Sequence, residues 1–239
     1  MMRKRSFEPL IRGFLEGATK KGNPGTIRCT IGCKKKIVDI NRTIIYYTGM
    51  RLKDETKNEN IFNATLQLIN EVGLSETSMS KIAKSAKVSA STIYVYFENK
   101  EDLLNKLYLE AKRKMSEEMF TDFDESLPIQ TAYEISLRRF THFILKNKDY
   151  FLFIEQFQNS PLLKKITSEE SAEYFEPLYR LFEKGKEQNI LKQVDTSLLN
   201  IFTSYPVMQA AKEHFLGKSE LNEDKLNLIV QMTWDSVKA

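Results

Sequence analysis

The stretch TSMSKIAKSAKVSASTIYVYFENKEDLL, residues 77–104, decides how the fold is interpreted. Small apolar residues recur in it at helical spacing, and short polar residues stand where helices would begin. The pattern predicts a short helix capped by Ser78, a tight turn, a second short helix from Ser89, and a longer helix capped by Asn99. Two short helices joined by a tight turn form a helix-turn-helix.

The local charge of this stretch suits a nucleic acid. Lys81, Lys84 and Lys87 stand between Thr77 and Phe97 with no Asp or Glu among them. A helix N-terminus with free backbone N–H groups and short hydroxyl side chains attracts phosphate. We therefore expect the outward-facing positions of the second short helix to enter a major groove of DNA.

The chain from Asn58 onward reads as helices, and no strand pattern competes. Apolar residues at helical spacing predict a first helix that ends at Gly73, which supplies a left-handed residue. We expect Pro177 and Pro206 to kink two later helices, because proline removes a backbone hydrogen bond, and Asn189 to be a left-handed terminator. The later helices are predicted over residues 129–146, 150–158, 168–188, 195–216 and 221–237.

Residues 82–103 resemble the DNA-binding domain of the TetR family of transcriptional regulators. The matching pattern is Ile-Ala-x-x-Ala-x-Val-Ser, then Thr-Ile-Tyr-x-Tyr-Phe and Lys-Glu-x-Leu. Lys87 and Ser91 depart from it, since glycine is common at both positions in the family. Lys87 must accept whatever φ the turn imposes. The resemblance implies an all-α fold, with an N-terminal three-helix DNA-binding domain and a C-terminal helical domain for ligand binding and dimerisation.

The same resemblance implies which residues contact DNA. Phosphate contacts fix the register of a protein on the duplex without reading its sequence. The residues in that role would be Ser78, Thr92, Tyr94, Tyr96 and Lys100. The base-facing positions would be Ala90, Ser91 and Val95, and the two apolar ones suit thymine methyl groups. Lys87 and Ser89 complete the predicted DNA-binding set, whereas Phe97 should pack against the first helix.

The residues after about 115 are helical and rich in aromatic side chains, most of which core packing explains. Proteins similar to this chain keep a ligand cavity between their middle helices and form a four-helix bundle with a partner. The predicted pocket residues are Phe140, Phe143, Phe157 and Phe182. The predicted dimer interface comprises Leu198, Phe202, Tyr205, Leu228, Ile229, Met232 and Val237. Dimerisation is also what DNA recognition requires, because one short helix reads too few bases.

Charge divides the chain unevenly. Residues 1–49 hold 11 Lys and Arg against 3 Asp and Glu, whereas the other 190 residues hold 25 against 29. Three interpretations of this basic, irregular extension compete: an arm that grips DNA phosphates, a targeting segment, or residues upstream of a true start at Met50. We favour the last. The predicted domains are then residues 50–104 for DNA binding and 105–239 for effector binding and dimerisation.

Several other kinds of function lack a signal in the sequence. We expect no enzymatic activity and no cofactor, because no Gly-rich phosphate loop or catalytic constellation is recognisable. Cys29 and Cys33 lack further ligands for a zinc site. The histidines are His142 and His214; a pocket role is open to His142, but we expect it to be solvent-facing or hydrogen-bonded, and we expect the acids at 122–125 and 169–170 to be solvated. No stretch is long and apolar enough to span a membrane, nor does the start contain an apolar signal core.

These features favour a dimeric repressor that binds a palindromic double-stranded DNA operator. We expect an unidentified small-molecule effector to release it, and we expect a cytoplasmic, nucleoid-associated protein of bacteria. The alternative keeps the fold but makes the C-terminal domain a docking surface for another protein.

Overall fold

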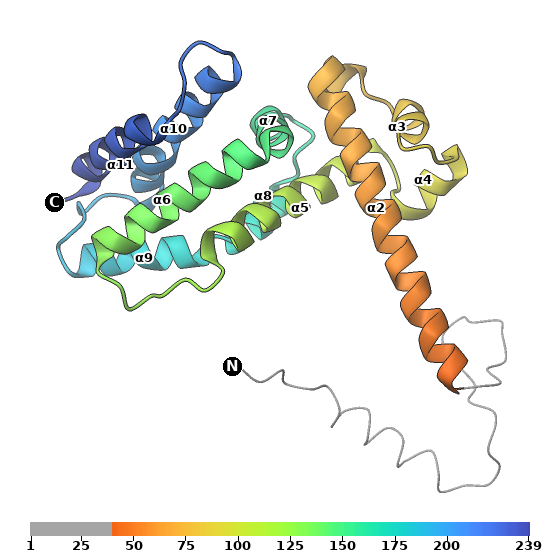
Figure 1. Cartoon of the computed structure of the whole chain (residues 1–239), viewed down its shortest axis with the longest axis horizontal. Coiled ribbons are helices and arrows are strands. Elements are labelled where there is room, and N and C mark those ends of the chain that lie inside the picture. Colours follow the sequence, from red (N-terminus) through yellow and green to blue (C-terminus); the bar gives the residue numbers. More distant parts are fainter. Residues whose placement is uncertain (1–39) are drawn as a thin grey trace, which may run out of the picture. The chain divides into compact units, whose positions relative to one another are not determined.

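The computed structural model describes the backbone of residues 40–239, and the side chains from residue 57 onward except at residue 166. The chain divides into two compact units, Met1–Lys57 and Asn58–Ala239. The first helix of the described residues is α2 (Ile40–Glu76) (Figure 1). It begins before Met50, so the last part of the extension that was predicted to be irregular is helical. Cys29 and Cys33 lie outside the described residues.

The helices predicted around the decisive stretch are all present. The helical backbone of α2 is interrupted at Gly73 (φ 82°, ψ 168°), the residue predicted to end the first helix. The next three helices are α3 (Met79–Ser85), α4 (Ala90–Tyr96) and α5 (Lys100–Phe120). Ile82, Ile93 and Phe97 are buried in the shared core, and the Phe97 ring lies 5.7 Å from that of Phe62 on α2. The predicted packing of Phe97 is thereby confirmed.

The remaining helices form a bundle in which α6 is central. It packs against α5, α7, α9, α10 and α11, and Figure 1 shows it running between α5 and the α10–α11 pair. The six helices are α6 (Ile129–Lys146), α7 (Lys148–Phe157), α8 (Lys165–Glu173), α9 (Glu176–Glu187), α10 (Thr196–Phe215) and α11 (Glu223–Val237). The described part of the chain contains no β-strand, only an isolated bridge between Leu191 and Lys238.

One predicted helix is wrong. Residues 168–188 were expected to form a single helix kinked at Pro177, but α8 ends at Glu173 and α9 starts at Glu176. Pro177 therefore lies in the first turn of a new helix, where its missing N–H would have had no partner in any case. Pro206 does lie inside a helix, α10. Asn189 has a positive φ of 54° after α9, as predicted.

Candidate DNA-binding face and effector cavity

Side-chain caps begin both short helices of the helix-turn-helix. The Ser78 hydroxyl accepts a hydrogen bond from the backbone N–H of Lys81 at 3.3 Å, and that of Ser89 accepts one from Thr92 at 3.1 Å. Helices of seven residues are marginal by themselves. The caps and the buried contacts of Ile82 and Ile93 therefore hold them in place.

The turn between α3 and α4 places Lys87 in the left-handed region, at φ 55°. The N–H of Val88 then donates to the carbonyl of Ala83 at 3.0 Å and closes the turn. A side chain in this conformation is strained, which explains why glycine suits the position. The Lys87 side chain itself is exposed, so it is free to reach a nearby phosphate.

The outer surface of α4 exposes the side chains predicted to face the bases. Ala90 and Ser91 are exposed, and Tyr94 and Val95 keep 56% and 78% of their surface accessible. Ser89 also hydrogen-bonds through its hydroxyl to those of Ser91 and Thr92, both at 2.8 Å. Exposed apolar side chains beside a hydroxyl cluster give this surface the chemistry of a DNA-contacting face.

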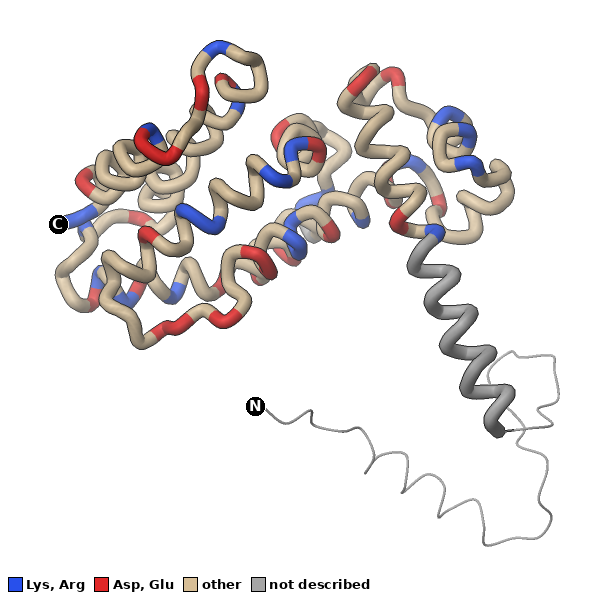
Figure 2. Tube along the Cα trace, viewed as in Figure 1, with Lys and Arg blue, Asp and Glu red and all other residues tan. Residues whose placement is uncertain are grey.

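Positive charge surrounds this surface. Figure 2 shows basic residues on α3, which are Lys81 and Lys84, and no Asp or Glu on α3 or α4. Lys84 and Lys87 are exposed and form no ion pair with any residue in the described range. Lys81 instead donates to the carbonyl of Glu76 at 2.7 Å. Two of the three lysines in this stretch are therefore available to phosphate.

Two predicted phosphate contacts have packing roles of their own. The Lys100 ammonium donates to the carbonyl of Leu74, and burial lowers the pKa of Lys100. This bond ties the first residue of α5 to the end of α2. Tyr96 is half-buried, with its ring 6.4 Å from that of Phe97. Lys100 and Tyr96 therefore help to position the helix-turn-helix, whereas Tyr94 is directed to solvent.

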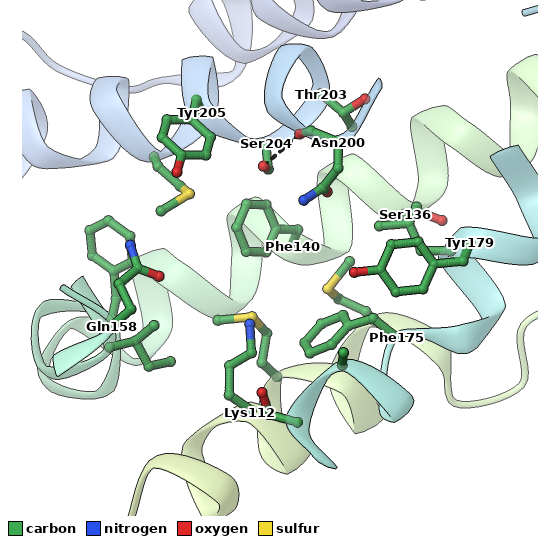
Figure 3. A pocket seen from close by; sticks show the side chains of 18 of the residues that line it. Lys112, Ser136, Phe140, Gln158, Phe175, Tyr179, Asn200, Thr203, Ser204 and Tyr205 are labelled. Carbon is green, nitrogen blue, oxygen red and sulfur yellow. Dashed lines mark hydrogen bonds between the residues drawn. The ribbon is translucent and has the colours of Figure 1, made fainter. Parts of the chain in front are cut away.

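A cavity of about 270 Å³ lies in the C-terminal bundle. Figure 3 shows α10 on one side of it, with Asn200 and Tyr205, and α5 on the opposite side, with Lys112. Its walls are mainly apolar or neutral polar. The lining residues are Tyr108, Lys112, Met115, Met119, Ser136, Leu137, Phe140, Phe151, Ile154, Gln158, Ser168, Ser171, Ala172, Phe175, Leu178, Tyr179, Asn200, Thr203, Ser204, Tyr205 and Met208.

Of the four predicted pocket residues, only Phe140 lines this cavity. Phe157 and Phe182 are fully buried core residues. Phe143 is also buried and contributes to a separate surface hollow beside Lys114 and Arg139. An aromatic-rich helix predicts a large core, but it does not reveal which ring borders a void. Phe143, Phe157 and Phe182 do not line this cavity.

The sequence analysis missed the cavity's charged residue, Lys112. It is the only Lys, Arg, His, Asp or Glu among the lining residues. Its ammonium lies 4.3 Å from the centre of the Phe175 ring, and burial lowers the pKa of Lys112 to about 8. A signal existed in the sequence, because Tyr108, Lys112, Met115 and Met119 share one helical face.

The residues predicted to form a dimer interface mostly lie at the surface. The exposed members are Leu198, Phe202, Tyr205, Leu228 and Met232, with 41 to 69% of their surface accessible. Ile229 is half-buried. Ile201, at 44%, belongs with them but was not predicted, and Val237, at 1%, is an internal core residue. Large apolar residues this exposed on two adjacent helices are typical of a surface that a partner covers.

The histidines have no place in the cavity. His142 lies on the surface 3.6 Å from Glu118, and the Nδ1 of His214 accepts from the backbone N–H of Leu221 at 3.3 Å. The position of His142 fits its predicted solvent-facing role. No group of His, Cys, Asp and Glu suited to a metal ion occurs among the described residues. Within the same range, no helix is both long and apolar enough to cross a membrane.

Family models match both halves of the described chain. Residues 61–107 match the model for bacterial regulatory proteins of the tetR family, and residues 128–238 match the tetracyclin repressor-like C-terminal domain. The chain belongs to the TetR family. It is accordingly a DNA-binding transcriptional regulator with the all-α TetR fold, as the resemblance of residues 82–103 implied.

Individual TetR-type proteins agree with this assignment. The chain is 27% identical over 184 residues to an uncharacterized HTH-type transcriptional regulator of Haemophilus influenzae. The alignment covers 75% of this chain and 95% of that protein. A TetR regulator from Marinobacter aquaeolei superposes with a TM-score of 0.74 at 24% identity, over 79% and 98% of the two chains. The regulator FadR of Bacillus subtilis, solved with stearoyl-CoA, superposes with a TM-score of 0.59 at 19% identity, over 73% and 96%.

Proposed function

We propose that this TetR-family regulator is a homodimeric repressor that a small molecule, bound in the cavity, releases from a palindromic operator. The observation that carries the proposal is that one helix serves both sites. α5 starts directly after the helix-turn-helix, where Lys100 is bonded to the end of α2. The same helix then lines the cavity through Tyr108, Lys112 and Met115. A ligand that displaces α5 would therefore move the DNA-reading helix.

Two further connections would carry such a movement. The Asn105 side chain, on α5, donates to the carbonyl of Leu162 at 2.9 Å and accepts from the N–H of Lys164 at 3.1 Å. The Asn70 side chain, on α2, donates to Asp149 on α7 at 3.2 Å. These bonds join α2 and α5 to α7 and to the segment between α7 and α8. They supply a contiguous physical route for coupling.

The dimer would form through the exposed faces of α10 and α11. Tyr205 contributes both to this surface and to the cavity lining. A ligand beside Tyr205 would therefore also affect how two subunits pack.

In the dimer, a two-fold pair of α4 helices would contact two DNA half-sites about one helical turn, roughly 34–36 Å, apart. The residues of α4 proposed to contact DNA include Ala90, Ser91, Tyr94 and Val95. Such a regulator acts on the bacterial chromosome, in the cytoplasm.

The energetics limit what a ligand must do. It shifts operator binding only by its differential affinity for the two states of the dimer, and about 1–3 kcal/mol of coupling changes operator affinity about 5- to 150-fold. The stearoyl-CoA in the Bacillus subtilis FadR structure supports an effector with an apolar part. The apolar side chains of this cavity agree with such a ligand.

The test uses an operator selected from random duplex DNA and compounds that raise the melting temperature of the purified protein. We expect at least one stabilising compound to weaken operator binding about 5- to 150-fold in fluorescence anisotropy. Reciprocal weakening of compound binding by the operator should have the same magnitude. If bound compounds leave operator affinity unchanged, the proposal fails and the alternative is favoured, in which the C-terminal domain is a docking surface for another protein.

A further inference from the structure

The ammonium of Lys112 lies in an apolar cavity without a partner that matches its charge. It forms no hydrogen bond or ion pair with any residue in the described part of the chain, and its recorded contact is with the Phe175 ring at 4.3 Å. An aromatic face attracts a cation, but it offers no hydrogen-bond acceptor to the three ammonium protons. Figure 3 shows the nitrogen pointing toward the space below Phe140. The ammonium is therefore ready to receive an acceptor.

The other lining residues indicate how much negative charge the ligand carries. No Asp or Glu lines the cavity, and neither Arg nor His adds a second positive charge. An ammonium that has lost much of its hydration binds an anion more strongly than an exposed one does, because the surrounding dielectric is low. A single positive charge in the cavity wall is matched by a single negative charge.

The walls define the body of the ligand. Met115, Met119 and Met208 are flexible side chains that adapt to irregular apolar shapes. Asn200 and Tyr179 add neutral polar groups on the sides away from α5. A cavity of about 270 Å³ is near the lower end of the usual range of small-molecule pockets, about 300–1,000 Å³. That is the size of a short aliphatic or single-ring carboxylate.

We propose that the effector is a small organic monocarboxylate whose carboxylate is bound by Lys112 and whose apolar body lies among the methionine and phenylalanine side chains. The inference rests on the cavity being the effector site of the proposed function, and it names the chemical class of that effector. It differs from an acyl-CoA effector, because the carbonyl of a thioester is neutral and offers the Lys112 ammonium no negative charge.

The first test measures binding to the full-length protein by isothermal titration calorimetry. The probes are octanoate and phenylacetate, with methyl octanoate and methyl phenylacetate as neutral counterparts and octanoyl-CoA as the thioester. We expect the acids to bind at least tenfold more tightly than their esters and than octanoyl-CoA. The inference is overturned if the esters or the thioester bind as tightly as the acids, or if neither acid binds.

Substitution assigns the selectivity to one residue. Lys112→Met keeps a long flexible side chain and should lose at least tenfold in carboxylate affinity while retaining its ester affinity. Lys146→Met is the matched control, because it removes one exposed lysine of the same domain, paired with Glu118 rather than facing the cavity. Equal carboxylate affinity in Lys112→Met and in the unsubstituted protein would overturn the inference, provided that melting curves show both proteins folded.

Dependence on pH gives an independent readout. The titratable groups that face Lys112 from the other walls and from its own helix are the phenols of Tyr108, Tyr179 and Tyr205. Burial raises the pKa of Tyr108 and of Tyr179, so these two remain neutral. With a Lys112 pKa of about 8, carboxylate affinity should fall about 30-fold between pH 7 and pH 9.5. Lys112→Met should not show this fall, and an equal fall in that variant would contradict the assignment.

Failure of this inference and failure of the proposed function are distinguishable. If a carboxylate binds through Lys112 but operator affinity does not change, the carboxylate site is supported and the proposed repressor mechanism is contradicted. The opposite result is a neutral compound that releases the operator and binds to Lys112→Met as tightly as to the unsubstituted protein. That result would support the repressor mechanism and contradict the carboxylate effector.

Discussion

The helix-turn-helix and the cavity are specified by different kinds of interaction. Ser78, Ser89 and Asn99 cap α3, α4 and α5 through hydrogen bonds to backbone N–H groups a few residues further on. By contrast, α6, α7, α8 and α9 begin without any side-chain cap. The DNA-reading unit is thus defined largely by residues that are neighbours in sequence. The cavity depends on side chains that meet from six helices, α5 to α10.

This difference determines where substitutions should act. Local hydrogen bonds in the helix-turn-helix have separable, modest effects. Side chains on the cavity and its neighbouring surface act through burial and association, whose effects are larger. The predictions below test the contrast in order of decreasing expected effect.

The largest effect should come from the exposed apolar face of α10 and α11. Phe202→Glu combined with Met232→Glu places two charges on that face, where the side chains are 49% and 69% exposed. Because a monomer holds only one half-site helix, operator affinity should fall by at least about 100-fold. Analytical ultracentrifugation should show a monomer. Leu216→Glu, also at an exposed site, is the control and should stay dimeric; a double variant that remains dimeric would contradict the assigned interface.

Lys112→Met should stabilise the protein without ligand. Burial lowers the pKa of Lys112 in the folded state from 10.5 to about 8, so the folded state is penalised while this lysine is charged. At pH 7 we expect the free energy of unfolding to rise by about 3 kcal/mol.

The pH dependence of that gain has a definite sign. Above pH 8 the folded protein releases the Lys112 proton before the unfolded chain does, so the penalty decreases as the pH rises toward 10.5. The advantage of Lys112→Met should therefore shrink over this range in urea denaturation. A gain that is constant with pH would show that charge burial is not its cause.

Ser89→Ala should cost about 1 kcal/mol of stability, because the N–H of Thr92 loses its cap. Chemical denaturation followed by circular dichroism measures the change. Ser85→Ala is the matched control, since Ser85 is exposed near the end of α3 and caps no helix. Equal effects of the two substitutions would remove the role assigned to local caps.

Lys87→Gly should produce the smallest change, a gain of about 0.5 kcal/mol. It relieves the left-handed strain at φ 55° but makes the unfolded chain more flexible. Asn189→Gly, at φ 54° in the cavity domain, should gain less, because asparagine tolerates this conformation better than lysine does. A larger gain at Asn189, measured by thermal unfolding, would contradict this explanation.

Sequence reasoning succeeded where the decisive information was local. The caps at Ser78, Ser89 and Asn99 identified their helices, and the amphipathic pattern of residues 129–146 gave the limits of α6. It was wrong at Pro177, because a proline suits both a kink and the first turn of a new helix. Only the packing of α8 and α9 distinguishes these two outcomes.

The cavity was harder to predict because a void depends on residues distant in sequence. Phe140 and Phe143 lie on the same helix, yet only Phe140 borders the cavity. Lys112 resembled the many solvated lysines of a charged helix, and its ring contact comes from Phe175, which lies between α8 and α9. The residues of α4 needed no such information, since their exposure follows from the buried positions of a single short helix.

The most direct test of the account is selection of bound DNA from a random duplex library by the purified full-length protein. The selection is repeated with Tyr94→Ala combined with Val95→Ala, a variant that should fold because both side chains are exposed. We expect a two-fold symmetric site that is enriched by the unsubstituted protein and lost with the variant. Well-folded protein that enriches no sequence, or a variant that selects the same site with the same affinity, would contradict DNA reading by α4.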